Sequence, residues 1–366
     1  MSRRLRLDLA SPERLKRFAV IGAILPLFAV IPGIGWADVL DPVPSAGCGG
    51  TGLAAGYHEF VTEFDGIPRT FGVHVPASHD KNVPSPVLMN FHSLLLGGPS
   101  LRNLFSTMSN QTVKSEEANF IVIEADGTPH DSELGSNVYS WNAGTACCNP
   151  PEAQDVDDVG YVVNVLEQML KTLCIDRRRI YASGMSNGGY MSHRLACEIP
   201  EYFAAIAPVV GSFSPELTCA GDDGMPVLQI TGSLDNLASR QASVDRWLLL
   251  NECGPETTVS VENDTTCTTH TNCKDGVLVR HCVVDQGNHC FFTNAELSFM
   301  TDCPVRPTGP LAHDMIWDFV SDWALVTPVP EPVPVPTLSP PLLGLLAVVL
   351  VGLVAVVLRR VRAEAR

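Results

Sequence analysis

Residues 184–188 read Gly-Met-Ser-Asn-Gly, the G-x-S-x-G pattern of a serine nucleophile. In this pattern the serine lies on a tight turn between a strand and a helix, and glycines are needed where side chains would collide. The flanking residues fit, since 180–183 are typical of a strand and 189–198 of a helix. The pattern therefore predicts Ser186 as a nucleophile, with an ordinary glycine-rich turn as the alternative.

Such a serine works with an acid and then a histidine later in the chain. Asp235 follows the apolar run 227–230, at the expected end of a strand. Its carboxylate would fix the tautomer of the histidine and stabilise the imidazolium, although aspartates in such turns also make local hydrogen bonds. His289 follows the strand-like run 277–284. It would take the proton from Ser186 and return it to the leaving alkoxide.

Two other late histidines compete with His289 for the role of the base. His313 precedes the apolar stretch 315–320 and is expected to be exposed near the start of a helix. His281 falls inside the strand-like run and is the weaker candidate.

Acyl transfer also needs two backbone N–H groups aimed at the developing negative charge. One is expected from Asn187, directly after the nucleophile. The second is expected from the loop after Phe91, where Ser93 and Leu94 are the candidate donors. These groups complete the predicted catalytic set, and none of this chemistry requires a cofactor or a metal.

The elements that must position these residues alternate between strands and helices. Residues 87–91, 120–123 and 227–230 are short apolar runs, typical of strands buried on both faces of a parallel sheet. Residues 159–172 place a broad apolar face on a helix, and Asp157 and Asp158 stand before it, where carboxylates are expected to cap. The alternation predicts a doubly wound α/β domain, with a mostly parallel sheet and helices on both faces. Three tryptophans are expected in its core: Trp141, Trp247 and Trp317.

Several motifs occur in a fixed order: Trp-Asn-Ala-Gly at 141–144, Cys-Cys at 147–148, Val-Asp-Asp-Val-Gly at 156–160, the Ser186 motif, Arg-Leu-Ala-Cys-Glu at 194–198 and Phe-Ala-Ala-Ile-Ala-Pro-Val at 203–209. In this combination the chain resembles the exported polyhydroxybutyrate depolymerase and feruloyl esterase family of α/β-hydrolases, from about residue 65 to 317. The resemblance implies the α/β-hydrolase fold and hydrolysis of carboxylic esters, in a polyester or in a feruloylated or acetylated polysaccharide. Asp235 occupies the place of the family's catalytic acid, and His289 that of its histidine.

The chain departs from the family near two of these residues. Asn288 stands where the family has a second glycine, and Cys-Phe-Phe at 290–292 replaces Ala/Thr-Trp-Pro. Ser93 replaces the glycine of a His-Gly pair after Phe91. If that position requires a positive φ, serine would shift or weaken the oxyanion hole.

Composition and charge narrow the possible partners. The 366 residues carry a net charge of −16, with basic residues concentrated at both ends, so that 38–341 holds 14 basic and 37 acidic residues. Nucleic acid is therefore not expected as a partner, because phosphate binding needs clustered Lys and Arg. A neutral ester substrate, small or polymeric, fits this surface better.

Both ends predict export. Residues 1–37 have a basic start, an apolar run and small residues before a cleavage point at Ala37, as in a signal peptide; an N-terminal membrane anchor is the alternative.

The esterase domain would span 38–326, followed by a proline-rich linker with a sorting motif at 327–341, a transmembrane helix at 342–358 and a basic cytoplasmic end at 359–366. The tail resembles an IPTL-type sorting signal, with Val-Pro-Thr-Leu at 335–338, and implies an exosortase-like protease as well as signal peptidase as partners. A plain anchor is the alternative. Either places the domain outside the cytoplasm of a Gram-negative-type bacterium, at the cell surface or beyond.

All twelve cysteines follow the predicted leader, and an even number in an exported chain predicts disulfides. Cys147 and Cys148 are adjacent, so each is expected to pair elsewhere. Cys267, His270 and Cys273 have a spacing that could bind zinc, but oxidation of these cysteines is favoured in an exported chain.

Two function classes follow from this sequence. The first is an active ester hydrolase using Ser186, Asp235 and His289. The second is a surface-displayed protein with a hydrolase fold and impaired catalysis, acting as a binding or matrix component. The complete triad favours the first class, whereas Ser93 and the altered segment around His289 favour the second.

Overall fold

The structure is a computed structural model that describes residues 4–6, 41–132, 135–148, 155–237, 240–294, 303, 306 and 309–332. The chain divides into one unit of residues 1–331 and another of 332–366. Apart from residues 4–6 the predicted leader lies outside the described residues, as do the sorting motif at 335–338, the predicted transmembrane helix and the basic end. Among the described helices, none is long and apolar enough to cross a membrane.

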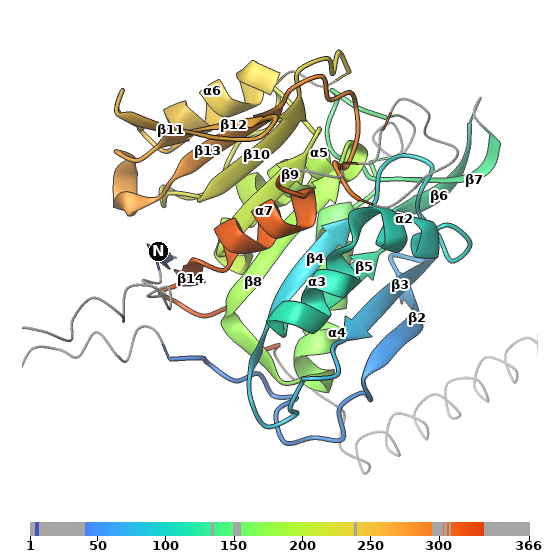
Figure 1. The fold of residues 1–366 in the computed structure, drawn as a ribbon. Coiled ribbons are helices and arrows are strands. Elements are labelled where there is room, and N and C mark those ends of the chain that lie inside the picture. The colour runs from blue at the N-terminus through green and yellow to red at the C-terminus, as the bar shows by residue number, and fades with distance from the viewer. Residues whose placement is uncertain are drawn as a thin grey trace, which may run out of the picture. The chain divides into compact units, whose positions relative to one another are not determined.

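A ten-stranded sheet runs through the first unit in the order β11-β12-β13-β10-β9-β8-β4-β5-β3-β2 (Figure 1). The six central strands, from β13 to β5, are parallel, and the two strands at each end are antiparallel to their neighbours. The strands are β2 (Gly56–Phe64), β3 (Ile67–Val75), β4 (Ser85–Phe91), β5 (Ile121–Ala125), β8 (Ile175–Met185), β9 (Ala205–Val209), β10 (Val227–Gly232), β11 (Thr257–Glu262), β12 (Thr265–His270) and β13 (Val279–Val284). Every residue of β4, β5, β9 and β10 is buried, as predicted for strands covered on both faces.

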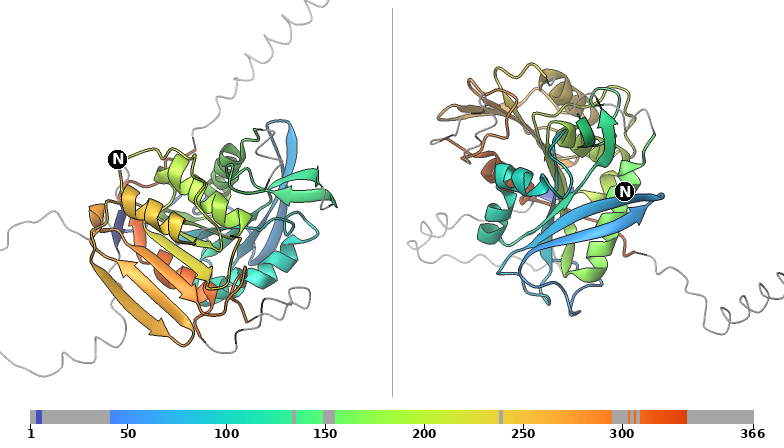
Figure 2. Two further views of the ribbon diagram at one scale, coloured as in Figure 1. Left: turned by 90° about the horizontal axis from the view of Figure 1, so that it is seen from above. Right: turned by 90° about the vertical axis from the view of Figure 1, so that its right-hand side faces the viewer.

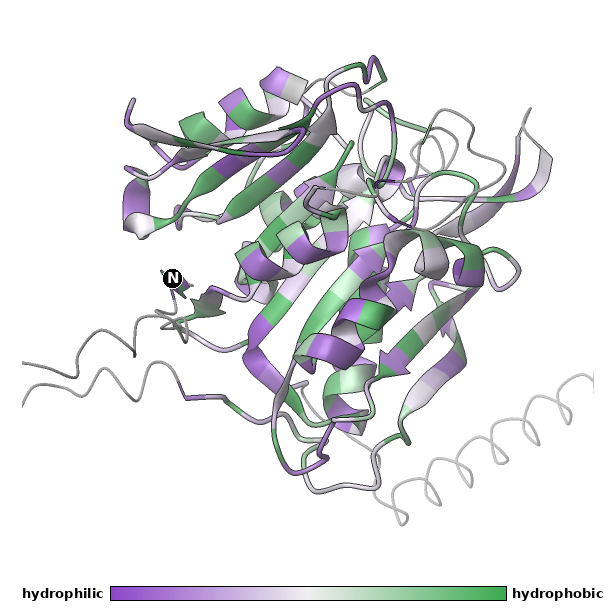
Figure 3. Cartoon of the chain, in the orientation of Figure 1, coloured by the Kyte–Doolittle hydropathy of each residue, from purple (hydrophilic) through white to green (hydrophobic). Residues whose placement is uncertain are grey.

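Helices cover both faces of this sheet (Figures 1 and 2). The helices are α2 (Arg102–Ser109), α3 (Gln111–Ala118), α4 (Asp158–Thr172), α5 (Asn187–Glu198), α6 (Arg240–Leu250) and α7 (Ala312–Val320). On one face α3 contacts α2 and α7, and on the other α4 contacts α5. In Figure 3, α3 and α7 carry both hydrophilic and hydrophobic colours, as expected for helices with one face on a core. The predicted doubly wound arrangement is therefore confirmed.

Two short sheets lie outside this arrangement. β6 (Thr128–Ser132) and β7 (Gly135–Ser140) form a hairpin, and β1 (Arg4–Arg6) pairs with β14 (Trp323–Leu325). Two 3₁₀ turns, Pro200–Tyr202 and Lys274–Gly276, complete the described elements. β1 lies inside the predicted leader, and Arg4 donates hydrogen bonds to the carbonyls of Phe203, Gly224 and Pro200.

All twelve cysteines are paired, in the bonds Cys48–Cys174, Cys147–Cys148, Cys197–Cys219, Cys253–Cys273, Cys267–Cys282 and Cys290–Cys303. The prediction of disulfides is confirmed, but the expectation that Cys147 and Cys148 pair elsewhere is wrong. The other ten cysteines take one another as partners, which leaves these two neighbours to each other. Cys267 and Cys273 both belong to disulfides, so neither thiol is free to bind zinc.

A buried histidine links α5 to the next strands and to α6. His193 accepts a hydrogen bond at Nδ1 from the Trp247 indole N–H (2.9 Å), and its Nε2 lies 3.0 Å from Gln229 Oε1. Because the indole can only donate, Nδ1 carries no proton and the ring is neutral. Burial lowers the pKa of His193 to about 4.

This histidine predicts a loss of stability in acid. Its folded-state pKa of about 4 is below the unfolded value of about 6.5. The unfolded state therefore takes up the proton first as the pH falls, and stability is lost between pH 6.5 and 4. The difference between these two pKa values corresponds to about 3 kcal/mol. His193→Leu should lower stability at pH 7 but lose this pH dependence, measured by urea unfolding at pH 7 and pH 4.5. The same pH dependence in both proteins would contradict the assignment.

Candidate active site

Ser186 lies at the turn between β8 and α5, with φ 52° and ψ −118°. These angles are in a region that non-glycine residues rarely adopt, and they persist only where surrounding contacts hold them. One such contact is the hydrogen bond from Ser186 N to Val209 O (2.9 Å). A Cβ at Gly188 would lie 2.0 Å from Phe91 O, and one at Gly184 would lie 2.6 Å from the backbone of Gly188. The two glycines of the motif are therefore needed for close packing of the turn against β4.

The structure brings Ser186, Asp235 and His289 together. His289 Nε2 lies 2.7 Å from Ser186 Oγ, and His289 Nδ1 lies 3.1 Å from each carboxylate oxygen of Asp235. Asp235 is buried, and it also accepts a hydrogen bond from Leu237 N (2.9 Å). Because an ionised carboxylate only accepts, the proton of a neutral His289 is on Nδ1. Nε2 is then free to accept the proton of the Ser186 hydroxyl.

These three residues follow the ends of three parallel strands, of which β13 and β10 are neighbours and β9 lies between β10 and β8. Ser186 follows β8, Asp235 follows β10 and His289 follows β13, in the order nucleophile, acid, histidine. A strained serine at a strand-to-helix turn, in a sheet of this order with helices on both faces, is specific to one architecture. The chain has the α/β-hydrolase fold.

Both segments expected to supply the oxyanion donors of this α/β-hydrolase lie beside the turn. Asn187 is the first residue of α5, where backbone N–H groups have no partner inside the helix. The loop after β4 passes next to it, since a Cβ at Gly188 would lie 2.6 Å from His92 O. Ser93 is not among the residues with positive φ; in this loop those are Leu95, at φ 72°, and Gly98, at φ 83°. The predicted strain at Ser93 is therefore absent, because this backbone position does not require glycine.

Sequence comparison relates the chain to known enzymes. Residues 106–235 match the model of the prolyl oligopeptidase family (Peptidase_S9), a stretch that includes Ser186 and ends at Asp235. Feruloyl esterase B of Piromyces equi is 25% identical over 240 residues, covering 59% of this chain and 42% of that protein. Feruloyl esterase D of Neurospora crassa is 28% identical over 242 residues, covering 63% and 75%. The chain thus spans less than half the length of the Piromyces relative.

The chain is also similar to a solved structure. Acetyl xylan esterase from Aspergillus awamori superimposes with a TM-score of 0.48 and 14% sequence identity, over 64% of this chain and 94% of that one.

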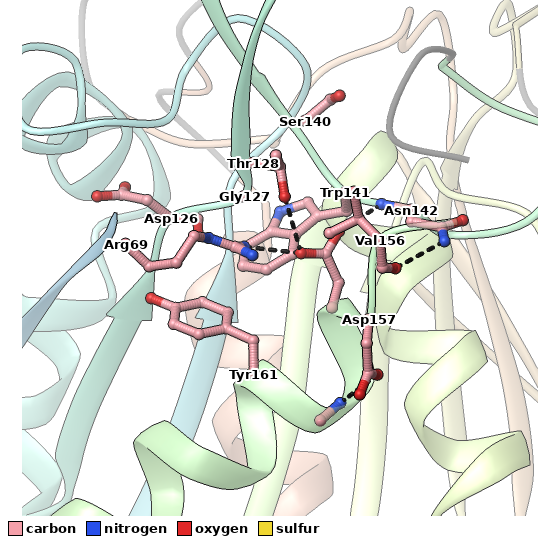
Figure 4. A network of polar contacts seen from close by, with 12 residues as sticks. Arg69, Asp126, Gly127, Thr128, Ser140, Trp141, Asn142, Val156, Asp157 and Tyr161 are labelled. Atoms are coloured by element: carbon pink, nitrogen blue, oxygen red, sulfur yellow. Dashed lines mark hydrogen bonds and ion pairs between the residues drawn. The ribbon is translucent and has the colours of Figure 1, made fainter. Parts of the chain in front are cut away.

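A buried ion pair joins β3 to the start of α4. Arg69 donates to Asp158 Oδ1 (2.7 Å), and both side chains are almost fully buried. Asp158 also accepts hydrogen bonds from Thr128 Oγ1 (3.2 Å) and from the backbone N–H of Asn142 (2.7 Å). In Figure 4, Arg69, Thr128 and Asn142 converge around this carboxylate, and the Arg69 guanidinium lies over the Tyr161 ring.

The prediction that Asp157 and Asp158 both cap α4 is therefore correct for Asp157 only. Asp157 caps the helix by accepting from Gly160 N (2.7 Å). Asp158 is fully buried and is not a cap, because its carboxylate is needed to compensate the buried charge of Arg69. By holding Asn142 N, it also fixes the segment that contains Trp141.

Trp141 joins the two candidate halves of the oxyanion hole. Its backbone N–H donates to Asn187 Oδ1 (2.7 Å), and its carbonyl accepts from Asn187 Nδ2 (3.1 Å). Its indole N–H donates to His92 O (3.2 Å), on the opposite loop. The sequence predicted only a core role for this tryptophan; its position in the Trp-Asn-Ala-Gly motif was the available signal for more.

The Cys147–Cys148 pair lies beside the same residues. Asn187 Nδ2 lies 3.8 Å from Cys147 Sγ, and Cys148 adopts φ 75°. The two cysteines are partly exposed. The adjacent pair therefore forms part of the surface next to Asn187.

The two other candidates for the base, His313 and His281, lie away from Ser186. His313 is in α7 and is buried, so the expectation that it is exposed is wrong; it lies on the helix face that covers the sheet. His281 is in β13, and its Nε2 lies 2.8 Å from Thr231 Oγ1. Within the described ranges, no group of three or more ligand-type side chains is arranged to hold a metal ion.

Proposed function

We propose that this chain is a serine esterase that hydrolyses carboxylic ester bonds through an acyl-enzyme. The observation that supports it most is the 2.7 Å contact between His289 Nε2 and Ser186 Oγ, with Asp235 on the other ring nitrogen. The two relatives reported above, which are named feruloyl esterases, support the same class of reaction.

The reaction would proceed in two halves. Ser186 Oγ attacks the ester carbonyl while His289 takes its proton, and Asp235 stabilises the resulting imidazolium. His289 then gives that proton to the leaving alkoxide, and the acyl group remains on Ser186. In the second half His289 activates a water, which releases the acid and restores the free serine. The N–H of Asn187 and a second donor from the 93–94 segment would stabilise the oxyanion in both halves.

We further propose that the substrate is an acylated plant polysaccharide, carrying feruloyl or acetyl groups. The relatives support this choice over a polyester, since two are named feruloyl esterases and a third, from Neocallimastix patriciarum, is named a bifunctional acetylxylan esterase/xylanase. The acidic surface between residues 38 and 341 agrees with an uncharged polymer as a partner. The Ser93 backbone gives no reason to prefer the impaired, purely binding alternative.

We also propose that the protein acts outside the cytoplasm. Six disulfide bonds support an oxidising compartment. Processing of residues 1–37 by signal peptidase, and of the tail by an exosortase-like protease, would deliver the domain to the cell surface. Mass spectrometry of the mature protein tests both cleavages.

Turnover of a substrate panel tests the enzymatic proposal. The full chain, produced in an oxidising compartment, is offered p-nitrophenyl butyrate, methyl ferulate, acetylated xylan and a hydroxybutyrate oligomer. We expect kcat/KM for methyl ferulate to exceed that for the oligomer by about tenfold or more, because pocket contacts discriminate at this scale.

A phosphonylating reagent provides the control. It should inactivate the enzyme in proportion to its attachment to the peptide that contains Ser186. A folded, fully oxidised protein that turns over none of the four substrates would contradict the esterase proposal, and preference for the oligomer would reverse the choice of substrate.

A further inference from the structure

The ring of His92 has a single possible protonation state in this fold. Its Nε2 lies 2.8 Å from the backbone nitrogen of Gly127, which can only donate, so Nε2 is an acceptor and carries no proton. Its Nδ1 lies 2.7 Å from the carbonyl oxygen of Ser93, which can only accept, so Nδ1 carries the proton. His92 is therefore a neutral imidazole with its proton on Nδ1, held from both sides.

The surroundings keep this ring in place. His92 is buried, and it packs against Trp141 (5.1 Å between ring centroids) and against the edge of Phe105 (6.4 Å). Gly97 closes the third side, because a Cβ there would lie 2.2 Å from His92 Nε2. Burial lowers the pKa of His92, against the opposing charge of Asp126, so that the neutral ring is favoured.

The contact with His92 determines how the next peptide is oriented. Ser93 O accepts from His92 Nδ1 and also from Leu96 N (3.1 Å), which occupies both of its lone pairs. In a trans peptide the N–H points opposite to the C=O. The Leu94 N–H is thereby directed away from the His92 ring, and within the described part of the chain no acceptor is bonded to it.

The peptide between His92 and Ser93 has the opposite orientation. His92 O faces the Trp141 indole (3.2 Å) and the Gly188 backbone. By the same geometry the Ser93 N–H points away from Trp141 and from the nucleophile turn. Of the two candidate donors, these orientations favour Leu94 over Ser93.

We propose that His92 is a positioning residue of the esterase: its Nδ1–H holds the Ser93 carbonyl and so keeps the Leu94 N–H available as the second oxyanion donor. The inference rests on the proposed function, since it assigns a role in the same reaction. His92 touches no reacting atom. Its effect would be on the transition state, where the negative charge develops, and not on binding of the ground-state ester.

Two matched variants separate the two ring nitrogens. In His92→Asn the side-chain amide nitrogen takes the place of Nδ1 and can still donate to Ser93 O, whereas the contact with Gly127 N is lost. In His92→Gln the amide oxygen takes the place of Nε2 and can still accept from Gly127 N, whereas the donor to Ser93 O is lost. Both variants remove the ring and should lower the melting temperature similarly.

The two variants are expected to differ in kcat. His92→Gln should lower kcat on p-nitrophenyl butyrate by about 10²-fold with little change in KM, the scale of losing one oxyanion donor. His92→Asn should keep kcat within about threefold of the wild type, because the donor at the Nδ1 position is restored. Equal losses of kcat in both variants, or a loss that appears in KM alone, would overturn the positioning role.

The outcome is distinguishable from failure of the proposed function. If the wild-type protein turns over no ester, the esterase proposal fails before the variants are compared. If the wild type is active and His92→Gln is as active as His92→Asn at matched stability, only the role of His92 fails. Should both variants fail to fold, the tautomer itself is tested in the wild type by the ¹⁵N chemical shifts of His92, and a proton on Nε2 would overturn the inference.

Discussion

Replacement of Ser186 by alanine is expected to lower kcat on p-nitrophenyl butyrate by about 10⁶-fold, the scale found when a triad serine is removed. The reason is chemical: without Oγ no acyl-enzyme can form, and His289 has no proton to accept at 2.7 Å. Binding of the ester should be little affected, because the oxyanion donors and the pocket remain. Stopped-flow and steady-state kinetics with stoichiometric active-site titration measure the loss.

Ser186→Gly is the matched control for folding. The serine adopts φ 52° and ψ −118°, at a cost of about 1–3 kcal/mol that glycine does not share. Glycine in turn loses about 0.5–1 kcal/mol more backbone entropy on folding. We therefore expect the glycine variant to be as inactive as the alanine variant, yet about 1 kcal/mol more stable than it by urea unfolding. Residual activity above about 1% of wild type in both variants, beyond what a contaminant explains, would remove Ser186 from its proposed role.

Asp235→Asn is expected to lower kcat by about 10⁴-fold. Asp235 Oδ1 accepts from Leu237 N (2.9 Å), so an asparagine would keep its oxygen there and turn its NH₂ toward His289. An NH₂ facing Nδ1 favours the proton on Nε2, where it blocks proton transfer from Ser186. The measurement is kcat across pH 6 to 9, with KM expected to remain close to that of the wild type.

His313→Gln is the matched control for this prediction. His313 is a buried histidine of α7 and makes no described contact with Ser186, Asp235 or His289. Its replacement should lower the melting temperature without lowering kcat. If instead His313→Gln abolishes turnover while Asp235→Asn does not, the proposed triad of Ser186, Asp235 and His289 is wrong.

The nucleophile turn was predictable because its requirements are local. A serine between two glycines, preceded by an apolar run and followed by a helical one, has few other structural solutions, and the strand and helix around Ser186 lie where the sequence places them. The buried central strands were predictable for a similar reason, since runs such as 87–91 have no polar face to expose. The acid and the histidine could be predicted only in order along the chain, with His313 and His281 left as rivals for the base.

The pairings between distant segments could not be read from the chain. Asp157 and Asp158 are adjacent and chemically identical, yet one caps a helix and the other neutralises Arg69, because only the packing of α4 against β3 decides which carboxylate is buried. The bond between Cys147 and Cys148 depends on where the other ten cysteines meet, which is a property of the whole fold.

The sequence by itself determined the kind of chemistry and the order of its residues, because a nucleophile, its turn and the apolar strands are each specified by neighbours in the chain. The tertiary structure decided which side chains meet and in which protonation state they are held. Asp235 and His289 reach Ser186 from separate strand ends, and the tautomer of His92 follows from a backbone N–H at residue 127 and a carbonyl at residue 93. Hydrogen-bond partners of this kind are set by distances in space, and the spacing of residues along the chain does not fix them.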